Sequence, residues 1–558
     1  MNQKPVQESK QPLPQSLTSE VRQEPPQAES AFTHFLHSHD VGWALAAVAG
    51  VAGLVWLVRW LKPRRRPAVP RAADYAPLQV LCGNRKTGAF DNSASRYILS
   101  ASWDEDSGVK SALSGKPVFY GHRTDKHLLT IAPTRTGKGR GLILPNLLDL
   151  PDHSVFVIDP KGENALVSAP YRQAEGHEIV IFNPYGIYAD EFKARGFAQF
   201  QSFNPLKNLD PDSQTFADDA AAIAEALIYD TGGDSHWTDG ARGFVEFLIM
   251  YLVTAPEEQE TCTFRRLREI IAGGYPLLNG TKKNNYEDGL FDKASKSDCH
   301  LVWENVGRYA NDDAEVRSII ATAETQTRMF KSDVLCAALD GEGFDFGRMK
   351  NRKTSVYLIL PSERLITQAR YLRLVLLVAM SQFMRSEKGK YQVVCLLDEF
   401  ANLGALQVIE NGYGLIAGHG VALWSFVQNL TQLQNLYKNN WEVFIANSAA
   451  VTVSNVNDVA TAEYFSKRAG RQEVQKTAFS MGRSEGDWEL FRSSSNSSAN
   501  TQWVWEDSLP VSSLYNADPE KLFLFLEGRA EPVQCRKLRY DRDEPFKGRA
   551  SGNPMHKS

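Results

Sequence analysis

Short, uninterrupted apolar runs recur along the chain, and most of them end in a polar or charged cluster. Such runs are typical of parallel strands that are buried on both faces. The runs predict strands at 127–131, 154–159, 177–183, 354–360, 393–397, 420–427 and 522–528, with two further short strands inside 441–458. Segments with helical spacing lie between several of these runs, at 142–148, 370–385 and 459–470. Strands that alternate with helices indicate an α/β fold with a parallel sheet.

The middle of the chain has a different pattern. Helical spacing prevails over 214–253, 263–272, 298–310 and 313–336. No convincing strand follows until 354–360. We therefore expect an all-α insertion domain, residues 234–345, between two halves of the α/β domain, residues 113–233 and 346–540. The insertion contains 20 acidic and 12 basic residues, a net charge of −8. This excess suits a basic partner, and the alternative is an ordinary solvated helical surface.

The N-terminal part reads as a membrane anchor. Residues 1–40 are rich in Gln, Pro, Ser and Glu and are expected to be disordered. Residues 41–58 carry no charge and are long enough to span a bilayer, which predicts a transmembrane helix over 41–61. Tryptophans near its ends and a basic cluster directly after it place its C-terminal side in the cytoplasm. The alternatives are a cleaved signal peptide and a buried helix, and the late start of the segment disfavours the former.

Three further segments lie outside the packed domains in this reading. Residues 62–112 are interpreted as a juxtamembrane connector between the membrane and the motor, and residues 541–558 as a loose C-terminal tail. Residues 480–500 are rich in serine, which is typical of a mobile loop.

A candidate phosphate-binding loop follows the first predicted strand. Its sequence APTRTGKG lies between the run at 127–131 and the apolar helix at 142–148. In this context successive backbone N–H groups and Lys138 can bind the phosphates of a nucleotide. The match to the phosphate-loop motif departs at Ala132, where the motif has glycine, and at Gly139, where it has Ser or Thr. The candidate nucleotide-binding residues are Pro133, Thr134, Arg135, Thr136, Gly137, Lys138, Gly139 and Arg140.

Polar residues at the ends of two later strands complete the candidate site. Asp398 ends the run at 393–397, where an aspartate can hold Mg²⁺, and Glu399 beside it can orient the attacking water. Gln428 ends the next strand and is a candidate sensor of the γ-phosphate, because ligands bind at the carboxyl ends of such strands. The alternatives are two acids that merely end a strand, and a helix cap by Asn429.

Net charge and cysteine content exclude some classes. The chain has a net charge of −4, which argues against a nucleic-acid binder that uses its whole surface. DNA held in a local channel remains compatible with it. The six cysteines are scattered and form no C-x-x-C pair, so neither a disulfide framework nor a zinc site is indicated.

Several motifs together resemble those of TraG-type coupling proteins, the ATPases of conjugation and type IV secretion systems. The motifs are APTRTGKGRGLILPNLL, SVFVIDPKGEN, FNPL, DSHWTDGAR, LLDEFANLG and the SFVQN/ANSAAV pair. The resemblance implies a RecA-like motor with an inserted all-α domain and an N-terminal membrane anchor. It also implies a protein of the bacterial inner membrane, mostly cytoplasmic, that binds ATP and Mg²⁺ and is a homo-hexamer when active; the one predicted span makes it single-pass. Its partners would be secretion channel components, relaxase or effector proteins bound by the insertion, and DNA.

The chain departs from the family pattern in three places. Many relatives have two membrane spans, and one is predicted here. Gly139 replaces the hydroxyl residue. Some relatives also carry an arginine before the sensor strand that reaches a neighbouring subunit, and residues 415–423 contain none. Arg370, Arg373 and Arg468 are possible substitutes.

Two alternative functions therefore stand beside a coupling ATPase. One is a membrane receptor that binds nucleotide and hydrolyses little of it. The other is an FtsK-like DNA translocase. Whether the cargo is DNA, effector proteins or both is left open by the sequence.

Overall fold

The computed structural model describes residues 97–102, 118–122, 124–229, 235–279, 289–311, 313–365, 367–482, 496–529, 531–543 and 546–554. The chain divides into two compact units, residues 1–66 and 67–558, and all described residues belong to the second. The predicted disordered segment 1–40 and transmembrane helix 41–61 lie outside the described residues. Within the described ranges, no helix is both long and apolar enough to cross a membrane.

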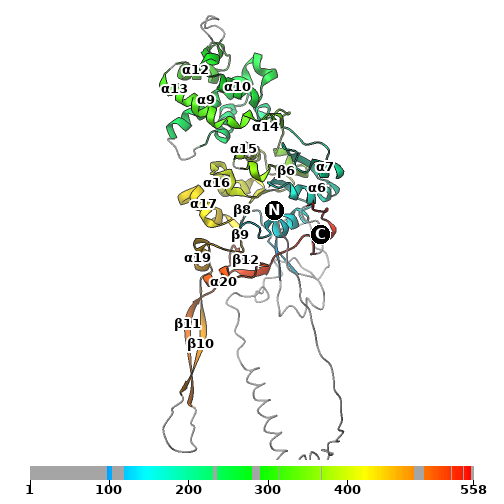
Figure 1. Ribbon diagram of the computed structural model, residues 1–558, viewed down its shortest axis with the longest axis vertical. Coiled ribbons are helices and arrows are strands. Elements are labelled where there is room, and N and C mark those ends of the chain that lie inside the picture. Colours follow the sequence, from blue (N-terminus) through cyan, green and yellow to red (C-terminus); the bar gives the residue numbers. More distant parts are fainter. Residues whose placement is uncertain are drawn as a thin grey trace, which may run out of the picture. The chain divides into compact units, whose positions relative to one another are not determined.

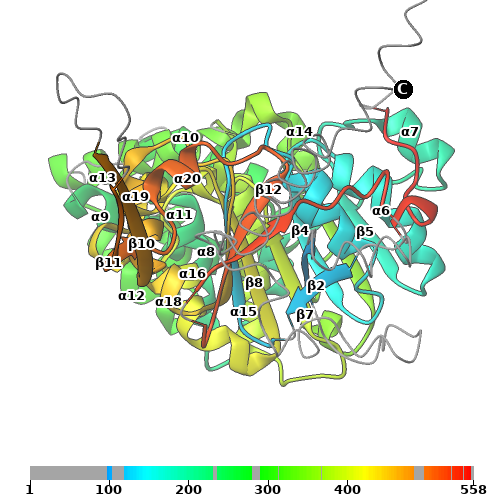
Figure 2. The ribbon, with the colours of Figure 1, turned by 90° about the horizontal axis from the view of Figure 1, so that it is seen from below.

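The centre of the second unit is an eleven-stranded sheet (Figure 2). Seven neighbouring strands of it are parallel, in the order β9 (Ser448–Val453), β3 (His127–Ile131), β8 (Val421–Val427), β7 (Val393–Leu397), β4 (Ser154–Asp159), β6 (Thr354–Ile359) and β5 (Glu178–Phe182). Every residue of these strands is buried except the first two of β5. Uninterrupted apolar runs form them because helices cover both faces.

Four antiparallel strands extend the sheet beyond β9: β12 (Lys521–Leu526), β13 (Val533–Arg536), β1 (Tyr97–Ser102) and β2 (Val118–His122). β1 lies within the predicted connector, residues 62–112, and joins the sheet by pairing with β13 through Ala101 and Arg536. Residues 441–458 differ from prediction. Their first apolar run forms a short helix, α18 (Val443–Ala446), and only the second forms a strand.

Helices pack on both faces of the sheet. The phosphate-loop helix α5 (Leu144–Leu147) and α6 (Glu163–Ala174) contribute to one core, with Val157, Leu396 and Trp424 from the strands. The opposite core includes α8 (Phe216–Leu227), α15 (Ala369–Arg385), α16 (Gln407–Leu415), α17 (Leu430–Tyr437) and α19 (Val459–Arg468). Because strand residues alternate between these cores, the face toward which a strand-end side chain points follows from its position.

The chain between β5 and β6 contains the helical region, which Figure 1 shows as a group of green helices. The group comprises α9 (Ser235–Thr254), α10 (Phe264–Asn279), α11 (Leu290–Ser295), α12 (His300–Tyr309), α13 (Ala314–Gln326) and α14 (Asp333–Ala338). Its described residues form no strand. Its core is joined to the motor core, because α8 packs against both α9 and α15.

A two-stranded sheet follows α19. Its strands, β10 (Arg471–Gly482) and β11 (Asn496–Asp507), pair along their full length and are visible as a long ribbon in Figure 1. The expectation of a mobile loop over 480–500 is therefore wrong at both ends of that range. Trp503 and Trp505 on β11 are 63% and 59% exposed.

The described part of the C-terminal tail is packed, so its prediction as a loose segment, 541–558, is wrong for residues 541–543 and 546–554. Phe546 is fully buried in the core of α5 and α6. Arg549 Nη1 donates to the carbonyl of Leu148 at 2.8 Å, and the Ser551 amide donates to the carbonyl of Val167 at 3.1 Å. The sequence of this segment is mostly polar because only a few of its side chains enter the core, and this is why it was predicted to be loose.

Candidate nucleotide-binding site

The phosphate loop, residues 132–138, begins where β3 ends. Arg135 and Gly137 have positive φ angles of 61° and 84°, which turn the backbone back toward the following helix. The Thr136 hydroxyl donates to the carbonyl of Pro133 at 2.7 Å and fixes the turn from within. The Gly141 amide donates to the carbonyl of Gly137 at 2.7 Å, so the helix starts directly after the loop. This is the strand–loop–helix arrangement that presents backbone N–H groups to phosphates.

The first turn of this helix is a π-helix, Gly139–Ile143, in which the Leu144 amide donates to the carbonyl of Gly139. Pro145 follows inside α5 and has no amide hydrogen for the carbonyl four residues before it. A wider turn before the proline is the expected response of the backbone. The close approach of the C-terminal segment favours glycine at 141, because an added Cβ would lie 3.1 Å from the carbonyl oxygen of Leu538.

The C-terminal segment contacts the phosphate loop and the residue that follows it. Lys537 Nζ donates to the carbonyl of Thr136 at 2.9 Å, and Arg140 Nε donates to Asp541 Oδ1 at 2.6 Å. The hydrogen bond from Asp541 raises the pKa of Arg140, whereas burial lowers the pKa of Lys537 to about 8. The Arg140 side chain is thus already paired, which leaves its backbone amide as its contribution to phosphate binding. Sequence reasoning missed this support because 401 residues separate the partners.

Three of the predicted site residues converge from separate segments. Lys138 Nζ lies 3.4 Å from Glu399 Oε1, and Gln428 Nε2 donates to Glu399 Oε2 at 3.1 Å. The Lys138 side chain is 8% exposed and that of Glu399 23%. Glu399 has a φ of 53°, a strained conformation for a non-glycine residue and one found mainly at functional sites. Asn429 caps α17 by accepting from the Gln432 amide at 3.1 Å, so the cap and the candidate sensor are adjacent residues.

Two carboxylates lie beside these residues. Asp159 ends β4 and Asp398 follows β7, and the register that pairs Ile158 with Leu397 places the two acids next to each other. The pKa of Asp398 is raised to about 6, mainly by burial; Lys138 opposes the rise and Glu399 contributes to it. Burial also raises the pKa of Asp159 to about 7, against a hydrogen bond from the Ala165 amide. Sequence reasoning gave Asp159 no role, although it carries the signal that identified Asp398, an acid at the end of a buried strand.

The oxygen atoms around position 139 fit a magnesium ion. A Cβ built on Gly139 would meet only Asn164 Oδ1, at 3.9 Å, so there is open space where the motif has a hydroxyl. Asp398, Asp159 and Asn164 provide the carboxylate and amide oxygens that Mg²⁺ prefers. In the described part of the chain, no three His, Cys, Asp or Glu side chains form a metal-binding group. Phosphate and water oxygens would therefore complete the coordination, as is usual for Mg²⁺ with nucleotides.

The three candidate arginines differ in what they can reach. Arg373 is 2% exposed, and its Nη1 donates to the carbonyls of Leu403 and Ala405 at 2.7 and 2.8 Å. It therefore cannot contact a neighbouring subunit's nucleotide. Arg370 is half-buried and donates to the carbonyl of Leu227 at 3.0 Å, and Arg468 is exposed near the end of α19.

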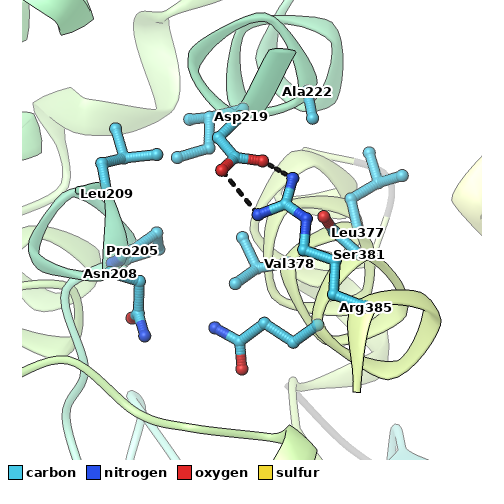
Figure 3. Close-up of a pocket in the computed structure, with 11 residues that line it drawn as sticks. Pro205, Asn208, Leu209, Asp219, Ala222, Leu377, Val378, Ser381 and Arg385 are labelled. Atoms are coloured by element: carbon cyan, nitrogen blue, oxygen red, sulfur yellow. Dashed lines mark hydrogen bonds and ion pairs between the residues drawn. The ribbon is translucent and has the colours of Figure 1, made fainter. Parts of the chain in front are cut away.

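The cavity drawn in Figure 3 does not belong to the nucleotide site. It has a volume of about 60 Å³ and lies between α8, α15 and residues 205–209, on the opposite face of the sheet from α5. The Asp219–Arg385 ion pair lines it (Figure 3). A larger hollow of about 410 Å³ adjoins the ends of β4 and β6 and is lined in part by Lys161, Tyr188 and Arg364.

The parallel sheet, the loop after β3 and the acids after β7 define a nucleotide-binding α/β fold of the P-loop class. Residues 95–558 match the family described as type IV secretory system conjugative DNA transfer, and the chain belongs to this family. The resemblance to TraG-type coupling proteins is thereby confirmed.

Individual relatives agree with this assignment. The chain is 25% identical over 390 residues to the conjugal transfer protein TraG of Escherichia coli, which covers 65% of this chain and 58% of the relative. It is 25% identical over 391 residues to protein VirD4 of Rhizobium radiobacter, covering 67% and 54%. The chain thus spans little more than half the length of these relatives.

Solved structures share the fold. The unbound conjugative coupling protein TrwB matches with a TM-score of 0.56 and 14% identity, over 74% of this chain and 85% of that one. TrwB in complex with ADP and Mg²⁺ matches with a TM-score of 0.52 and 14% identity, over 80% and 95%. The expected RecA-like motor is the fold that these neighbours have.

Proposed function

We propose that this chain is the coupling ATPase of a type IV secretion or conjugation system, and that it uses ATP and Mg²⁺ to deliver cargo to the secretion channel. The observation that carries the proposal is the convergence of Lys138, Glu399 and Gln428 beside a phosphate loop. TrwB, which has the same fold, has been solved with the ATP analogue ADPNP and with ADP and Mg²⁺. In this proposal the chain is located in the inner membrane and is a homo-hexamer when active. Its partners are relaxase or effector proteins, or DNA.

The geometry suggests how the residues act when nucleotide binds. The backbone amides of residues 133–140 and the Lys138 ammonium bind the β- and γ-phosphates. Lys138 exchanges its contact with Glu399 for phosphate oxygens, which frees the Glu399 carboxylate. Glu399 then accepts a hydrogen bond from the attacking water and orients it toward the γ-phosphate.

Two neighbouring side chains complete this arrangement. Gln428 Nε2, which donates to Glu399, holds that carboxylate in place and reaches the γ-phosphate from the next strand. Asp398 would hold the Mg²⁺ ion, whose positive charge stabilises the phosphate oxygens during transfer.

The test is an ATPase assay on the detergent-solubilised full chain, with and without DNA. Phosphate release that is lost in Lys138→Ala supports the proposal. No turnover by the wild-type chain under any of these conditions, with nucleotide binding retained, would instead identify the receptor alternative. The absent hydroxyl at Gly139 is the specific observation that favours this second candidate. A rate that increases strongly with duplex DNA alone would favour the FtsK-like translocase.

A further inference from the structure

Position 139 lacks the hydroxyl that the phosphate-loop motif provides for the metal ion, but another oxygen atom lies next to this space. The amide oxygen of Asn164 faces it, 3.9 Å from where a Cβ of residue 139 would be. Asn164 is 5% exposed, and its Oδ1 has no hydrogen-bond partner among the described residues. An amide oxygen that faces the phosphate loop and accepts no hydrogen bond there is available to a ligand.

The orientation of the Asn164 amide is seen in its contacts. Its Nδ2 donates to Asp159 Oδ1 at 3.3 Å. With the nitrogen toward Asp159, the oxygen faces the phosphate loop. Asp159 is itself held in place because its Oδ2 accepts from the Ala165 amide at 2.9 Å. The pair thus forms a fixed bracket at the start of α6.

We propose that the amide oxygen of Asn164 replaces the missing hydroxyl and would bind the nucleotide's Mg²⁺, with Asp159 as its positioning residue. A hydroxyl and an amide oxygen are both neutral, hard ligands, so the exchange leaves the charge of the site unchanged. Both residues follow β4, which lies beside the Asp398 strand. The proposal rests on the proposed function, since it requires that this loop binds a nucleotide with Mg²⁺.

A purely structural role for the bracket predicts something different. Asp159 accepts from an amide in the first turn of α6, as a helix cap does, and Asn164 then only supports that cap. In that case loss of Asn164 would lower thermal stability and would weaken ADP binding equally with and without metal.

The experiment measures metal binding rather than turnover. The full chain in detergent is titrated with Mn²⁺ in the presence of ADP, with free Mn²⁺ followed by electron paramagnetic resonance, and ADP binding is measured separately without metal. Asn164→Ala should weaken Mn²⁺ binding roughly tenfold or more while leaving metal-free ADP binding unchanged. Adding Gly139→Ser to Asn164→Ala should restore Mn²⁺ affinity, because the serine supplies the hydroxyl. Ser168→Ala is the matched control, a buried polar deletion one turn further along α6 that should change neither quantity.

Each other outcome has a defined meaning. Unchanged Mn²⁺ affinity in Asn164→Ala, or a loss that Gly139→Ser does not rescue, overturns the proposal. Should Asn164→Ala not fold, Gly139→Ser alone decides. If Asn164 already provides the oxygen ligand, Gly139→Ser should change Mn²⁺ affinity by less than about threefold. A gain of roughly tenfold or more would show that the wild-type chain provides no oxygen ligand at this position. Failure of the wild-type chain to bind ADP at all would refute the proposed function instead.

Discussion

The nucleotide site and the helical insertion both bring opposite charges together, but they satisfy them to different degrees. In the insertion, Arg266 donates twice to Glu258, at 2.7 and 2.6 Å, and Thr261 donates to the same carboxylate at 2.9 Å. At the site, Lys138 and Glu399 share one long contact of 3.4 Å. A fully satisfied pair stabilises one structure, whereas a loose pair can exchange its partners for a ligand.

The same difference is visible in the pKa values of the acids. Burial alone would raise the pKa of Glu258, but the hydrogen bonds from Arg266 and Thr261 lower it below its ordinary value. For Asp398 and Asp159 the compensation is incomplete, and burial raises their pKa values to about 6 and about 7. The Glu258–Arg266 pair of the insertion therefore stabilises the fold, whereas the buried acids of the motor remain available to a cation. The predictions below test this contrast, from the largest expected effect to the smallest.

Removing the cation of the site should have the largest effect. Lys138→Ala should abolish turnover and weaken ATP binding below detection, because the charge-assisted contact with the phosphates is lost. Binding of a fluorescent ATP analogue and phosphate release measure the two effects. Lys126→Ala is the control, an exposed lysine at the other end of β3 that should behave as wild type. Normal turnover in Lys138→Ala would show that the loop is not a phosphate site.

Removing the charge of Glu399, the partner of Lys138, should separate ATP binding from ATP hydrolysis. Glu399→Gln keeps the shape of the side chain but removes the negative charge that polarises water. ATP should still bind, and kcat should fall roughly 100-fold or more. Single-turnover kinetics measure this, with Glu410→Gln on α16 as the matched control. An unchanged kcat would reduce Glu399 to an acid that ends a strand.

The three converging residues could be found from the sequence because each signal is local. Lys138 lies in the loop motif that follows an apolar run, Glu399 and Gln428 lie at the ends of two others, and parallel strands bring their carboxyl ends to one edge of the sheet. The support of the loop could not be found in this way. Arg140 and Asp541 lie 401 residues apart, and nothing near either residue encodes the pairing.

The wrong secondary-structure predictions have physical reasons too. The run VFIA at 443–446 is apolar and short, so its pattern fits a helix turn as well as a strand. β1 pairs with β13 and β2 at the antiparallel end of the sheet, and such pairing partners are not visible in one segment of sequence. Among the described strands, β10 and β11 pair only with each other and not with the central sheet, so their sequences need not have the apolar pattern of its strands.

In the insertion, reversing a satisfied charge should cost stability. Glu258 is 4% exposed, and Glu258→Lys leaves Arg266 facing a second cation. We expect the free energy of unfolding to fall by roughly 2 kcal/mol or more, at the low end for a broken buried pair because Arg266 is partly exposed. Glu260→Lys, an exposed neighbour, should change it by less than about 0.5 kcal/mol. Urea unfolding of the two variants compares them, and equal losses would contradict the contrast between buried and exposed acids.

At the site, an uncompensated acid should make stability depend on pH. Because the pKa of Asp159 is raised from 3.8 to about 7, the folded chain retains a proton that the unfolded chain releases. Its contribution to stability is therefore present at low pH and is lost as the pH rises from about 4 to about 7. Asp159→Asn cannot titrate, so its thermal midpoint without nucleotide or metal should fall less over this range than that of the wild-type chain. Asp190→Asn, on the exposed start of α7 (Ala189–Ala194), should keep the wild-type dependence; a wild-type dependence in Asp159→Asn would contradict the assignment.

The smallest expected effect concerns the exposed acids of the insertion, which folding has not used. We expect this acidic surface to bind a basic cargo tail and not duplex DNA, because its net charge of −8 attracts the first and repels the second. The cluster contains Glu257, Glu258 and Glu260. Glu257 accepts a hydrogen bond from Tyr251 at 2.8 Å, and Glu258 is paired with Arg266. Of the three, only Glu260 can therefore have its charge reversed without disturbing one of these contacts. Glu260→Lys should weaken the binding of a basic peptide to the full chain by a few-fold, the size expected for one exposed charge pair.

Salt and temperature decide between docking and a local structural role for Glu260. Binding by an exposed surface should weaken as salt rises from about 0.05 to 0.3 M, because the Debye length shortens over that range. Glu260 also lies just before α10, where a negative charge favours the helix N-terminus. That role alone predicts a lower thermal midpoint with unchanged peptide binding. Fluorescence anisotropy of the peptide, with ATP turnover as the control for an intact motor, distinguishes the two, and salt-independent binding would place the cargo site elsewhere on the chain.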